Sequence, residues 1–325
     1  MAHDILKRLE EGTVLGDGGY VIELERRGYV IAGAFTPELV LTHPHAIREL
    51  HHEFVLAGCD VLQVMAFYGS REKLATVGKA DSTFEINQAA TRIAKEVAGD
   101  DVLVAGDLCA TWKWEADSPS ARELVAGMFD EQIEAQEGVD FFIGETFWHL
   151  GEALLCLERI KSQTNLPAMI TMAFRATTST DDGVSAADCA RRLRDAGADI
   201  VGTNCMRDPA RTLPVLREMR EAVDGHLAAQ PVAFACSDEV PWFTGTPAFP
   251  DRLDPTQLTR QELGDFARQA EDLGANFIGG CCGCLGSHMR EMAIALGKYD
   301  EEKIWKAAPE TPMSETEFNW EHRKA

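Results

Sequence analysis

The stretch RRLRDAGADIVGTNC, residues 191–205, contains the unit that decides the fold. A charged, helix-favouring segment ends at Gly197, and Ala198-Asp199 then leads into the apolar run Ile200-Val201. Glycine ends helices because it adopts the left-handed conformation without strain, and β-branched residues favour strands. The same join, with a glycine two residues before Asp or Asn, recurs at residues 57–60, 137–140 and 273–276. This repetition predicts helices that alternate with parallel strands.

Such helix and strand segments recur along the whole chain. We predict strands at residues 13–15, 60–67, 101–105, 139–143, 167–173, 199–201, 231–235 and 276–278. We predict helices at residues 39–57, 83–98, 118–137, 151–161, 185–196, 209–223, 259–273 and 287–296. This count is that of a single-domain α/β (β/α)8 TIM barrel, which we assign to residues 1–300, with a short C-terminal tail at 301–325. The alternative is an open doubly wound sheet, but Gly16-Asp17-Gly18-Gly19 does not match its phosphate-binding turn.

The charge of the chain restricts its partners. Its 325 residues include 31 Lys and Arg and 53 Asp and Glu, which gives a formal net charge of -22 at pH 7. A field of that sign repels phosphate groups, so we expect neither nucleic acid nor a membrane as a partner. The sequence has no apolar run of about 20 residues and no secretory signal. Nine cysteines without an export signal indicate a reducing compartment, so we expect a cytoplasmic protein.

Three cysteines are the sharpest signal in the sequence. Barrel enzymes carry their chemistry at the carboxyl ends of the strands, which we call the rim. Cys205 follows the sixth predicted strand, and Cys281 and Cys282 follow the eighth, between glycines that let the backbone kink. Three thiolates fill three positions of a tetrahedral Zn2+ site and leave the fourth open, as in catalytic zinc sites. We therefore predict a Zn2+ centre, with inert buried thiols as the alternative.

Other candidate metal ligands carry a weaker signal. Cys236 follows the seventh predicted strand and is either a spare ligand or a packing residue, while Cys284 points toward a helix start. His149 and His288 each stand at the start of a predicted helix, where a surface or supporting role is commoner. A closed site of four thiolates that includes Cys236 would indicate a zinc-binding barrel without catalysis.

An open metal position suits a thiol substrate. Coordination deprotonates a thiol, so the implied reaction is attack by that sulfur on a carbon electrophile. If the thiol belongs to an amino acid, Glu145 and Asp17 are the predicted catalytic carboxylates, because they stand at the rim and can receive its ammonium group. The turn from Gly16 to Gly19 offers backbone N–H groups to its carboxylate. The alternatives are an arginine-paired carboxylate for Glu145 and a turn-stabilising side chain for Asp17.

The electrophile should be a cation that leaves as a neutral molecule. Aromatic faces attract such onium groups by about 0.5–2 kcal/mol per contact. The predicted rim loops contain Phe35, Phe67, Tyr68, Trp112, Trp114, Phe147, Trp148, Trp242 and Phe243. Any one of these is more often a loop anchor, but their number favours an onium-binding cage.

The chain resembles the betaine–homocysteine S-methyltransferases, within the wider homocysteine S-methyltransferase family. The matching motifs are GDGGYVIELERRGYV (16–30), AGAFTPE (32–38), the stretch at 43–74, VDFFIGETF (139–147), GADIVGTNC (197–205) and NFIGGCCG (276–283). The resemblance implies methyl transfer from glycine betaine or a related donor to homocysteine, giving methionine. It implies Zn2+ on the three cysteines already named, and homocysteine held by Glu145 and Asp17-Gly18 with Gln63 nearby. It also implies that Tyr68 lies beside the donor.

Two positions depart from the betaine enzymes in the predicted donor pocket. Phe35 stands where another aromatic residue is expected, and Thr146 replaces an aromatic residue after the glutamate. These changes open the donor to sulfonium compounds such as S-methylmethionine or dimethylsulfoniopropionate. A corrinoid- or folate-linked module that needs a partner domain is a further alternative. The chain ends at residue 325, soon after the last predicted helix, so the family's long assembly arm is not expected and a homo-oligomer is left open.

Overall fold

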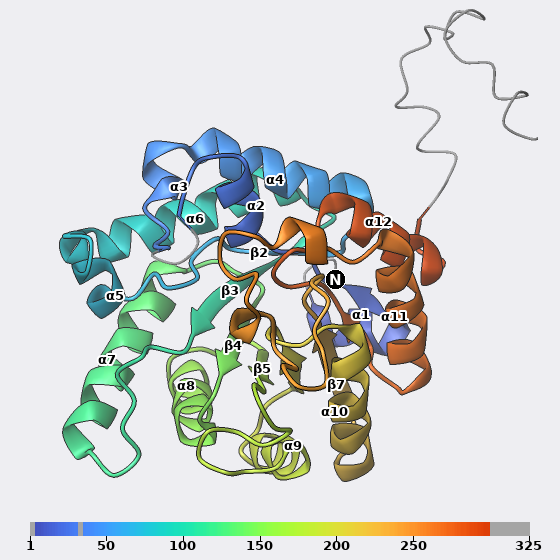
Figure 1. Cartoon of the computed structure of the whole chain (residues 1–325). Helices are drawn as coiled ribbons and strands as arrows, with labels where there is room; N and C mark the ends of the chain where they lie inside the picture. The colour runs from blue at the N-terminus through green and yellow to red at the C-terminus, as the bar shows by residue number, and fades with distance from the viewer. Residues whose placement is uncertain (1–3, 32–34, 300–325) are drawn as a thin grey trace, which may run out of the picture.

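The computed structural model describes residues 4–31 and 35–299. Its eight strands form one sheet in the order β1-β8-β7-β6-β5-β4-β3-β2, and neighbouring strands pair in parallel. The strands are β1 (Val14–Leu15), β2 (Val61–Gln63), β3 (Leu103–Cys109), β4 (Phe141–Phe147), β5 (Ala168–Met172), β6 (Ile200–Asn204), β7 (His226–Gln230) and β8 (Phe277–Ile278). Helices surround the strands as an outer ring (Figure 1). The prediction of a (β/α)8 barrel is confirmed.

The helices that surround the sheet end where the glycine joins predicted. Gly58, Gly138, Gly197 and Gly274 have φ values of 98°, 92°, 97° and 88°, in the left-handed region that glycine adopts without strain. The α-helices are α1 (Ile5–Glu11), α2 (Val21–Arg26), α3 (Leu39–Thr42), α4 (Pro44–Ala57), α5 (Arg71–Ala75), α6 (Thr83–Ala98), α7 (Pro119–Ala135), α8 (Leu150–Gln163), α9 (Ala186–Asp195), α10 (Pro209–Ala222), α11 (Arg260–Asp272) and α12 (Gly286–Ala295). Short 3-10 turns are η2 (Ala80–Ser82), η3 (Phe243–Gly245) and η4 (Asp254–Thr256).

One aspartate joins the two strands at the ends of the sheet, β1 and β2. The Asp60 N–H donates to the Leu15 carbonyl oxygen over 2.8 Å, and the Leu15 N–H donates to Asp60 Oδ2 over 2.7 Å. The Asp60 side chain therefore takes the place of a backbone carbonyl as the hydrogen-bond acceptor for β1. It closes the barrel at the point where both strands are short.

The interior of the barrel changes from apolar to polar toward the rim. Its amino-terminal part is filled by an apolar cluster from the strands and α1: Ile5, Leu9, Val14, Val61, Leu103, Ala105, Phe141, Ile143, Met169, Ile200, Ala228 and Phe277. Alternate residues of a strand share a face, so positions two or four residues further along point into the same interior. Those positions hold Gln63, Asp107, Glu145, Thr171, Asn204 and Gln230, which we call the polar layer. The apolar cluster thus supports a polar floor at the rim.

Three predicted elements differ from the structure. The seventh strand is His226–Gln230, and the predicted stretch 231–235 is a connection that follows it, buried over residues 231–234. The predicted helix 39–57 is two helices, because Pro44 has no N–H and restrains His43, whose φ and ψ are -138° and 57°. The predicted strand 60–67 forms a ladder only over Val61–Gln63.

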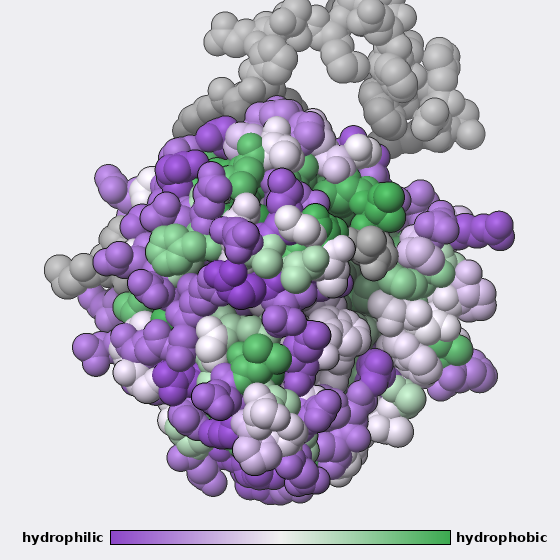
Figure 2. Space-filling view, turned by 90° about the vertical axis from the view of Figure 1, so that its left-hand side faces the viewer, coloured by the Kyte–Doolittle hydropathy of each residue, from purple (hydrophilic) through white to green (hydrophobic). Residues whose placement is uncertain are grey.

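The face of the molecule drawn in Figure 2 is mainly hydrophilic. On the side shown in Figure 2, hydrophilic side chains cover most of the area and hydrophobic ones form separate spots. Among the residues described, no helix combines the length and apolar character needed to cross a membrane. The predicted tail at 301–325 lies outside the described residues, so the boundary at residue 300 stays a prediction.

Candidate active site and metal centre

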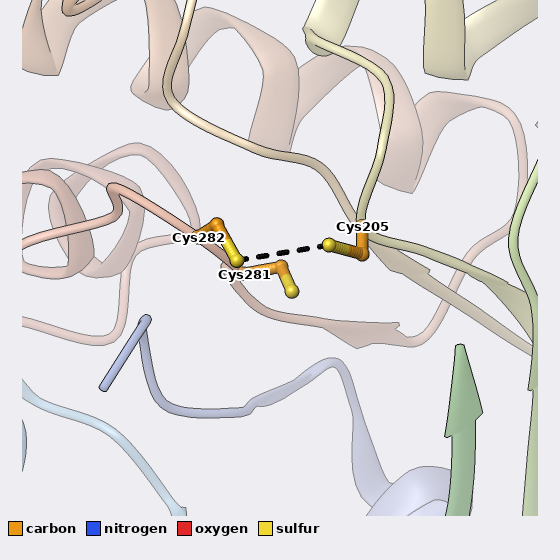
Figure 3. A group of neighbouring side chains, drawn as sticks. All are labelled: Cys205, Cys281 and Cys282. Carbon is orange, nitrogen blue, oxygen red and sulfur yellow. Dashed lines mark hydrogen bonds between the residues drawn. The ribbon is translucent and has the colours of Figure 1, made fainter. Parts of the chain in front are cut away.

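The barrel brings the three predicted thiols together at its rim. Cys205 directly follows β6, and Cys281 and Cys282 lie in the loop after β8. Their sulfur atoms all lie within 4.8 Å of one another, and the Cys205 and Cys282 Sγ atoms are 3.7 Å apart. Figure 3 shows the three side chains pointing toward one another from these two segments. Backbone bonds to the β7 end fix both segments, because the Cys205 N–H donates to Gln230 O and the Cys281 N–H to Pro231 O.

The donor set fits a soft metal ion. Four ligands at about 2.3 Å from Zn2+ form a tetrahedron with sulfur–sulfur edges of about 3.8 Å, close to the 3.7 Å between Cys205 and Cys282. Hydrogen bonds from Cys281 and Cys282 lower the pKa of Cys205 well below its usual range, and their bonds to Cys205 raise the pKa of both partners. A bound cation is needed for all three to be thiolates at once.

Glycine is required in the loop that carries the two vicinal cysteines. Gly283 has a φ of 81°, and a Cβ there would lie 2.5 Å from the Phe234 ring. A Cβ on Gly280 would lie 2.5 Å from the Cys284 Cβ. The loop can therefore turn sharply and bring both thiols to one side.

A pocket opens beside the thiols. It is lined by Gly18, Gly19, Tyr20, Val21, Gln63, Val64, Met65, Phe67, Asp107, Glu145, Thr146, Cys205, Gln230, Gly280, Cys281 and Cys282. The cavity offers about 70 Å³ to water-sized molecules, so it is narrow. Much of its floor is the polar layer. The predicted residues Gly18, Gln63 and Glu145 therefore share one pocket with the three thiols.

Glu145 is held by neutral hydrogen-bond donors. Gln63 Nε2 donates to Oε1 over 2.7 Å, while Asn204 Nδ2 and Thr146 Oγ1 donate to Oε2 over 2.6 and 3.0 Å. Burial, followed by the nearby Cys205 charge, raises its pKa to about 7. These partners are amides and a hydroxyl, so the alternative of an arginine-paired carboxylate does not hold. A ligand cation in the pocket would supply the missing positive charge.

Asp17 lies behind the pocket wall. Its carboxylate accepts hydrogen bonds from the Gln63 N–H, over 2.7 Å, and from the Tyr20 hydroxyl. Burial raises its pKa to about 7. Asp17 is not among the residues that line the pocket, whereas Tyr20 is. Asp17 therefore connects the turn after β1 to β2 through hydrogen bonds. This geometry favours the turn-stabilising alternative over direct contact with substrate.

Two backbone N–H groups of the Gly16–Gly19 turn donate hydrogen bonds within the protein. The Gly16 N–H donates to Ile278 O and the Gly19 N–H to Cys284 O, both close to 3 Å, at 2.8 and 2.9 Å. The turn is thereby pinned to the loop that carries the thiols. Gly18 also lines the pocket, and a Cβ there would lie 2.5 Å from Cys284 O and 2.6 Å from the Phe54 ring, so close packing requires glycine at this position.

His51 gives the fold a measurable pH dependence. Its Nδ1 is 2.9 Å from the Tyr20 hydroxyl oxygen, and because that hydroxyl donates to Asp17, Nδ1 must carry the proton. Burial lowers the pKa of His51 from 6.5 to about 3. The folded chain therefore keeps His51 neutral while an unfolded chain protonates it, so the contribution of His51 to the free energy of unfolding falls as the pH drops below about 6.5.

We expect His51→Gln to remove this dependence. Between pH 6 and 4 the wild type should lose about 1.4 kcal/mol more unfolding free energy per pH unit than the variant. Urea unfolding of the two proteins at several pH values measures the difference. His45→Gln, at an exposed histidine, should keep the wild-type slope. Parallel curves for wild type and His51→Gln would show that His51 is protonated in the folded chain.

Aromatic side chains form a row beside the pocket. The ring centroids of Phe67 and Tyr68 are 4.1 Å apart, those of Tyr68 and Trp112 are 6.2 Å apart, and those of Trp112 and Trp148 are 4.2 Å apart. Tyr68 and Trp112 have φ values of 61° and 62°, which are unusual for bulky residues. Such strain gathers at functional sites. Phe67 lines the pocket, and Tyr68 is half-buried next to it.

The other predicted aromatic residues do not line the pocket. Phe35 is buried in the main core cluster and does not line the pocket. Phe147 belongs to the same core, and the Trp114 ring packs on Gly151. Trp242 and Phe243 pack with Phe234 in a cluster that also contains Cys205 and Trp148, and Cys281 and Cys282 pack against it. Phe35 packs in the core in this structure, and its contact with substrate stays a prediction.

The rival metal ligands lie outside the thiol group. Cys236 comes well after the true end of β7, and its Sγ lies 3.6 Å from Phe234 O. The Cys284 Sγ lies 3.6 Å from Pro231 O. His288 is bonded to Leu258 O and the Leu285 N–H, and His149 stands just before α8. The described residues therefore do not form a closed site of four thiolates.

Sequence reasoning gave no role to Asp107 and Asn204. Both belong to the polar layer, and both are 1% exposed. The signal was the strand alternation: Leu103, Ala105 and Asp107 share one face of β3. Following that alternation past the apolar residues would have identified Asp107 as an interior carboxylate.

The fold and the site together define a class of protein. A parallel barrel with three thiols and a carboxylate-lined pocket at its rim is built for metal-assisted chemistry on a small thiol substrate.

Comparison with known proteins specifies the family. The model of the homocysteine S-methyltransferase family matches residues 14–296, and the chain belongs to this family. It is 39% identical over 306 residues to betaine–homocysteine S-methyltransferase 1 of Xenopus tropicalis, covering 90% of this chain and 75% of that protein. It is 38% identical over 306 residues to the S-methylmethionine–homocysteine S-methyltransferase BHMT2 of Pongo abelii, covering 90% of this chain and 81% of that one. The resemblance and the reaction class, methyl transfer to homocysteine, are confirmed.

Solved structures support the fold. The homocysteine methyltransferase MmuM of Escherichia coli, in its metallated form, matches with a TM-score of 0.72 and 18% identity, covering 89% of this chain and 99% of that one. A methyltransferase from Methanosarcina mazei matches with a TM-score of 0.56 and 13% identity, covering 90% and 97%. Both are relatives in fold.

Proposed function

We propose that this chain transfers a methyl group from a small onium donor to homocysteine, giving methionine, with Zn2+ held by Cys205, Cys281 and Cys282. The observation that carries the proposal is the convergence of three sulfurs on one side of a pocket that also contains Glu145. Zn2+ bound there would keep the homocysteine sulfur deprotonated at neutral pH.

The residues of the pocket have separate tasks in this reaction. Glu145 binds the ammonium group of homocysteine, since its present partners leave its negative charge unpaired. Gln63 and Asn204 orient that carboxylate from both sides. Gly18 lets the backbone approach the substrate carboxylate. Asp17 acts as a positioning residue that holds Gln63 and Tyr20.

The aromatic row supplies the donor side. Its faces attract a methylated cation, and Tyr68 and Trp112 lie at the loops beside the pocket. The donor methyl must come within about 3 to 3.5 Å of the acceptor sulfur for in-line transfer. We propose glycine betaine or a related betaine as the donor. A sulfonium donor is the second candidate, supported by the similarity to the S-methylmethionine enzyme and by the small Thr146 in the pocket lining.

One assay separates the two donor classes. Purified, metal-loaded protein is incubated with homocysteine and a series of donors: glycine betaine, other betaines, S-methylmethionine and dimethylsulfoniopropionate. Methionine is the readout. A preference for betaines supports the first candidate, and a preference for sulfonium compounds supports the second. No methionine with any onium donor would contradict the proposed reaction.

We expect Tyr68→Leu to weaken the donor side alone. Loss of one aromatic face should raise the donor KM by about 3- to 30-fold, the range of one cation–π contact, and leave the homocysteine KM unchanged. Steady-state kinetics with each substrate varied in turn measures both constants. Phe84→Leu, at an exposed aromatic residue on α6, is the control. An equal rise in both KM values would contradict a donor-specific role.

The cellular setting is also a proposal. All nine cysteines are unpaired, which suits a reducing compartment, and we propose the cytoplasm. We propose small-molecule substrates rather than nucleic acid or membrane partners because of the net charge of -22. A homo-oligomer is compatible with this account.

A further inference from the structure

Asp107 is a buried carboxylate to which the mechanism above gives no task. It lies on β3 within the polar layer, is 1% exposed and lines the pocket. In the ladder Asp107 pairs with Ile143, while Glu145 lies two residues further along β4 and on the same face. The two carboxylates are therefore on neighbouring strands, one level apart, and face the same interior.

The Asp107 backbone is held rigidly from outside the barrel. Gln136, just after α7, accepts from the Asp107 N–H over 2.7 Å and donates to the Asp107 carbonyl oxygen over 2.9 Å. Gln136 in turn donates to Asn87 Oδ1 over 2.9 Å. A side chain on such a fixed strand is positioned accurately, as binding residues need to be.

One oxygen of Asp107 has no partner. The Gln63 side chain and the Ala66 N–H lie close enough to its carboxylate to lower its pKa, yet Oδ1 is buried and has no hydrogen-bond partner. Gln63 donates to Glu145 over 2.7 Å, so this amide lies beside both carboxylates. Burial and the nearby Glu145 charge raise the pKa of Asp107 well above its usual range. A buried acceptor without a donor is costly unless a ligand completes it.

We propose that Asp107 binds the ammonium group of homocysteine together with Glu145, an inference that rests on the function proposed above. An ammonium group has three N–H donors and a positive charge, which suit two adjacent carboxylates. Glycine betaine and dimethylsulfoniopropionate do not fit this role, because neither has an N–H to offer Oδ1. In S-methylmethionine only the α-ammonium group could reach Oδ1, since its methylated sulfur has no hydrogen to donate. The aromatic row, at the loops above the polar layer, is the place for that cation.

The test compares two thiols in the metal-loaded protein. Homocysteine carries the ammonium group, and 4-mercaptobutanoate is the same molecule without it. Calorimetric titration gives both dissociation constants for wild type and Asp107→Asn. Asparagine keeps an acceptor for Gln63 but places neutral or N–H-bearing atoms toward the ammonium group. We expect the homocysteine constant to rise by about 10- to 100-fold and that of 4-mercaptobutanoate to change by less than about threefold.

A matched control separates ammonium binding from a general effect of neutralising a buried carboxylate. Glu152 on α8 is 2% exposed and accepts from the Thr111 N–H and Oγ1 over 2.8 and 2.6 Å, outside the pocket. Glu152→Gln should keep the wild-type ratio of the two constants. Asp107→Ser offers the same test with a smaller side chain if the asparagine variant does not fold.

The outcomes are distinct for the two proposals. A folded Asp107 variant that weakens both thiols equally, or neither, overturns the assignment of Asp107. Wild type that does not bind homocysteine more tightly than 4-mercaptobutanoate overturns the function on which it rests. Amine-specific loss in a folded Asp107 variant, with the Glu152 control unchanged, supports both.

Discussion

Replacing Cys281 with alanine is expected to abolish metal binding and activity together. The variant keeps two of three clustered sulfurs, and two thiolates do not fill a zinc site that leaves one position for substrate. We expect the metal content to fall from about one ion per chain to near zero. Turnover should fall by more than about 100-fold, since even a supporting contact to a metal ligand is worth about 10–100-fold. Elemental analysis and the methionine assay measure the two effects.

Cys236→Ala is the matched control for this substitution. Cys236 is a half-buried thiol in the connection that follows β7, but it lies outside the group of three. The variant should retain its metal and its activity. Full activity in Cys281→Ala, or loss of metal from Cys236→Ala, would contradict the proposed ligand set.

Replacing Glu145 with glutamine is expected to impair homocysteine binding with the metal still bound. The glutamine has nearly the same shape, and its carbonyl can still accept a hydrogen bond, but it lacks the charge that pairs with an ammonium group. A charge-assisted hydrogen bond is worth about 1.5–3 kcal/mol, so the homocysteine KM should rise by about 10- to 150-fold. The donor KM and the metal content should stay near the wild-type values.

Glu152→Gln again provides the comparison, since Glu152 is a buried glutamate outside the pocket. It should leave the homocysteine KM close to that of wild type. If Glu145→Gln changed the metal content and left the homocysteine KM alone, Glu145 would be a support for the thiols and not a substrate residue. The same assay thus distinguishes the two roles.

The fold could be predicted because its repeated join is local. A glycine that closes a helix shortly before a strand depends on a few neighbouring residues, and all four such glycines have positive φ. The seventh strand was misplaced because residues 231–235 are as apolar as a strand. Val232 and Phe234 are buried against rim loops, not in the sheet, while β7 itself begins and ends with the polar His226 and Gln230. Burial by distant loops leaves no local pattern.

The site could be predicted in part for the same reason. The motif GTNC places a thiol directly after β6, and the motif GGCC places two thiols in the loop that follows β8, and the barrel makes those strand ends converge. The directions in which loop side chains point could not be predicted from the sequence. Asp17 turns behind the wall toward Tyr20, and Phe35 turns into the core, because each depends on how its loop packs on other segments. To predict that Asp107 faces the interior, the end of its strand would have to be known to within two residues.

X-ray absorption at the zinc edge of the purified enzyme, with and without homocysteine, tests the central claim most directly. The account predicts three sulfur neighbours at about 2.3 Å in the free enzyme and a fourth when homocysteine is added. A first shell with fewer than three sulfurs from the protein, or one that homocysteine leaves unchanged, would contradict it.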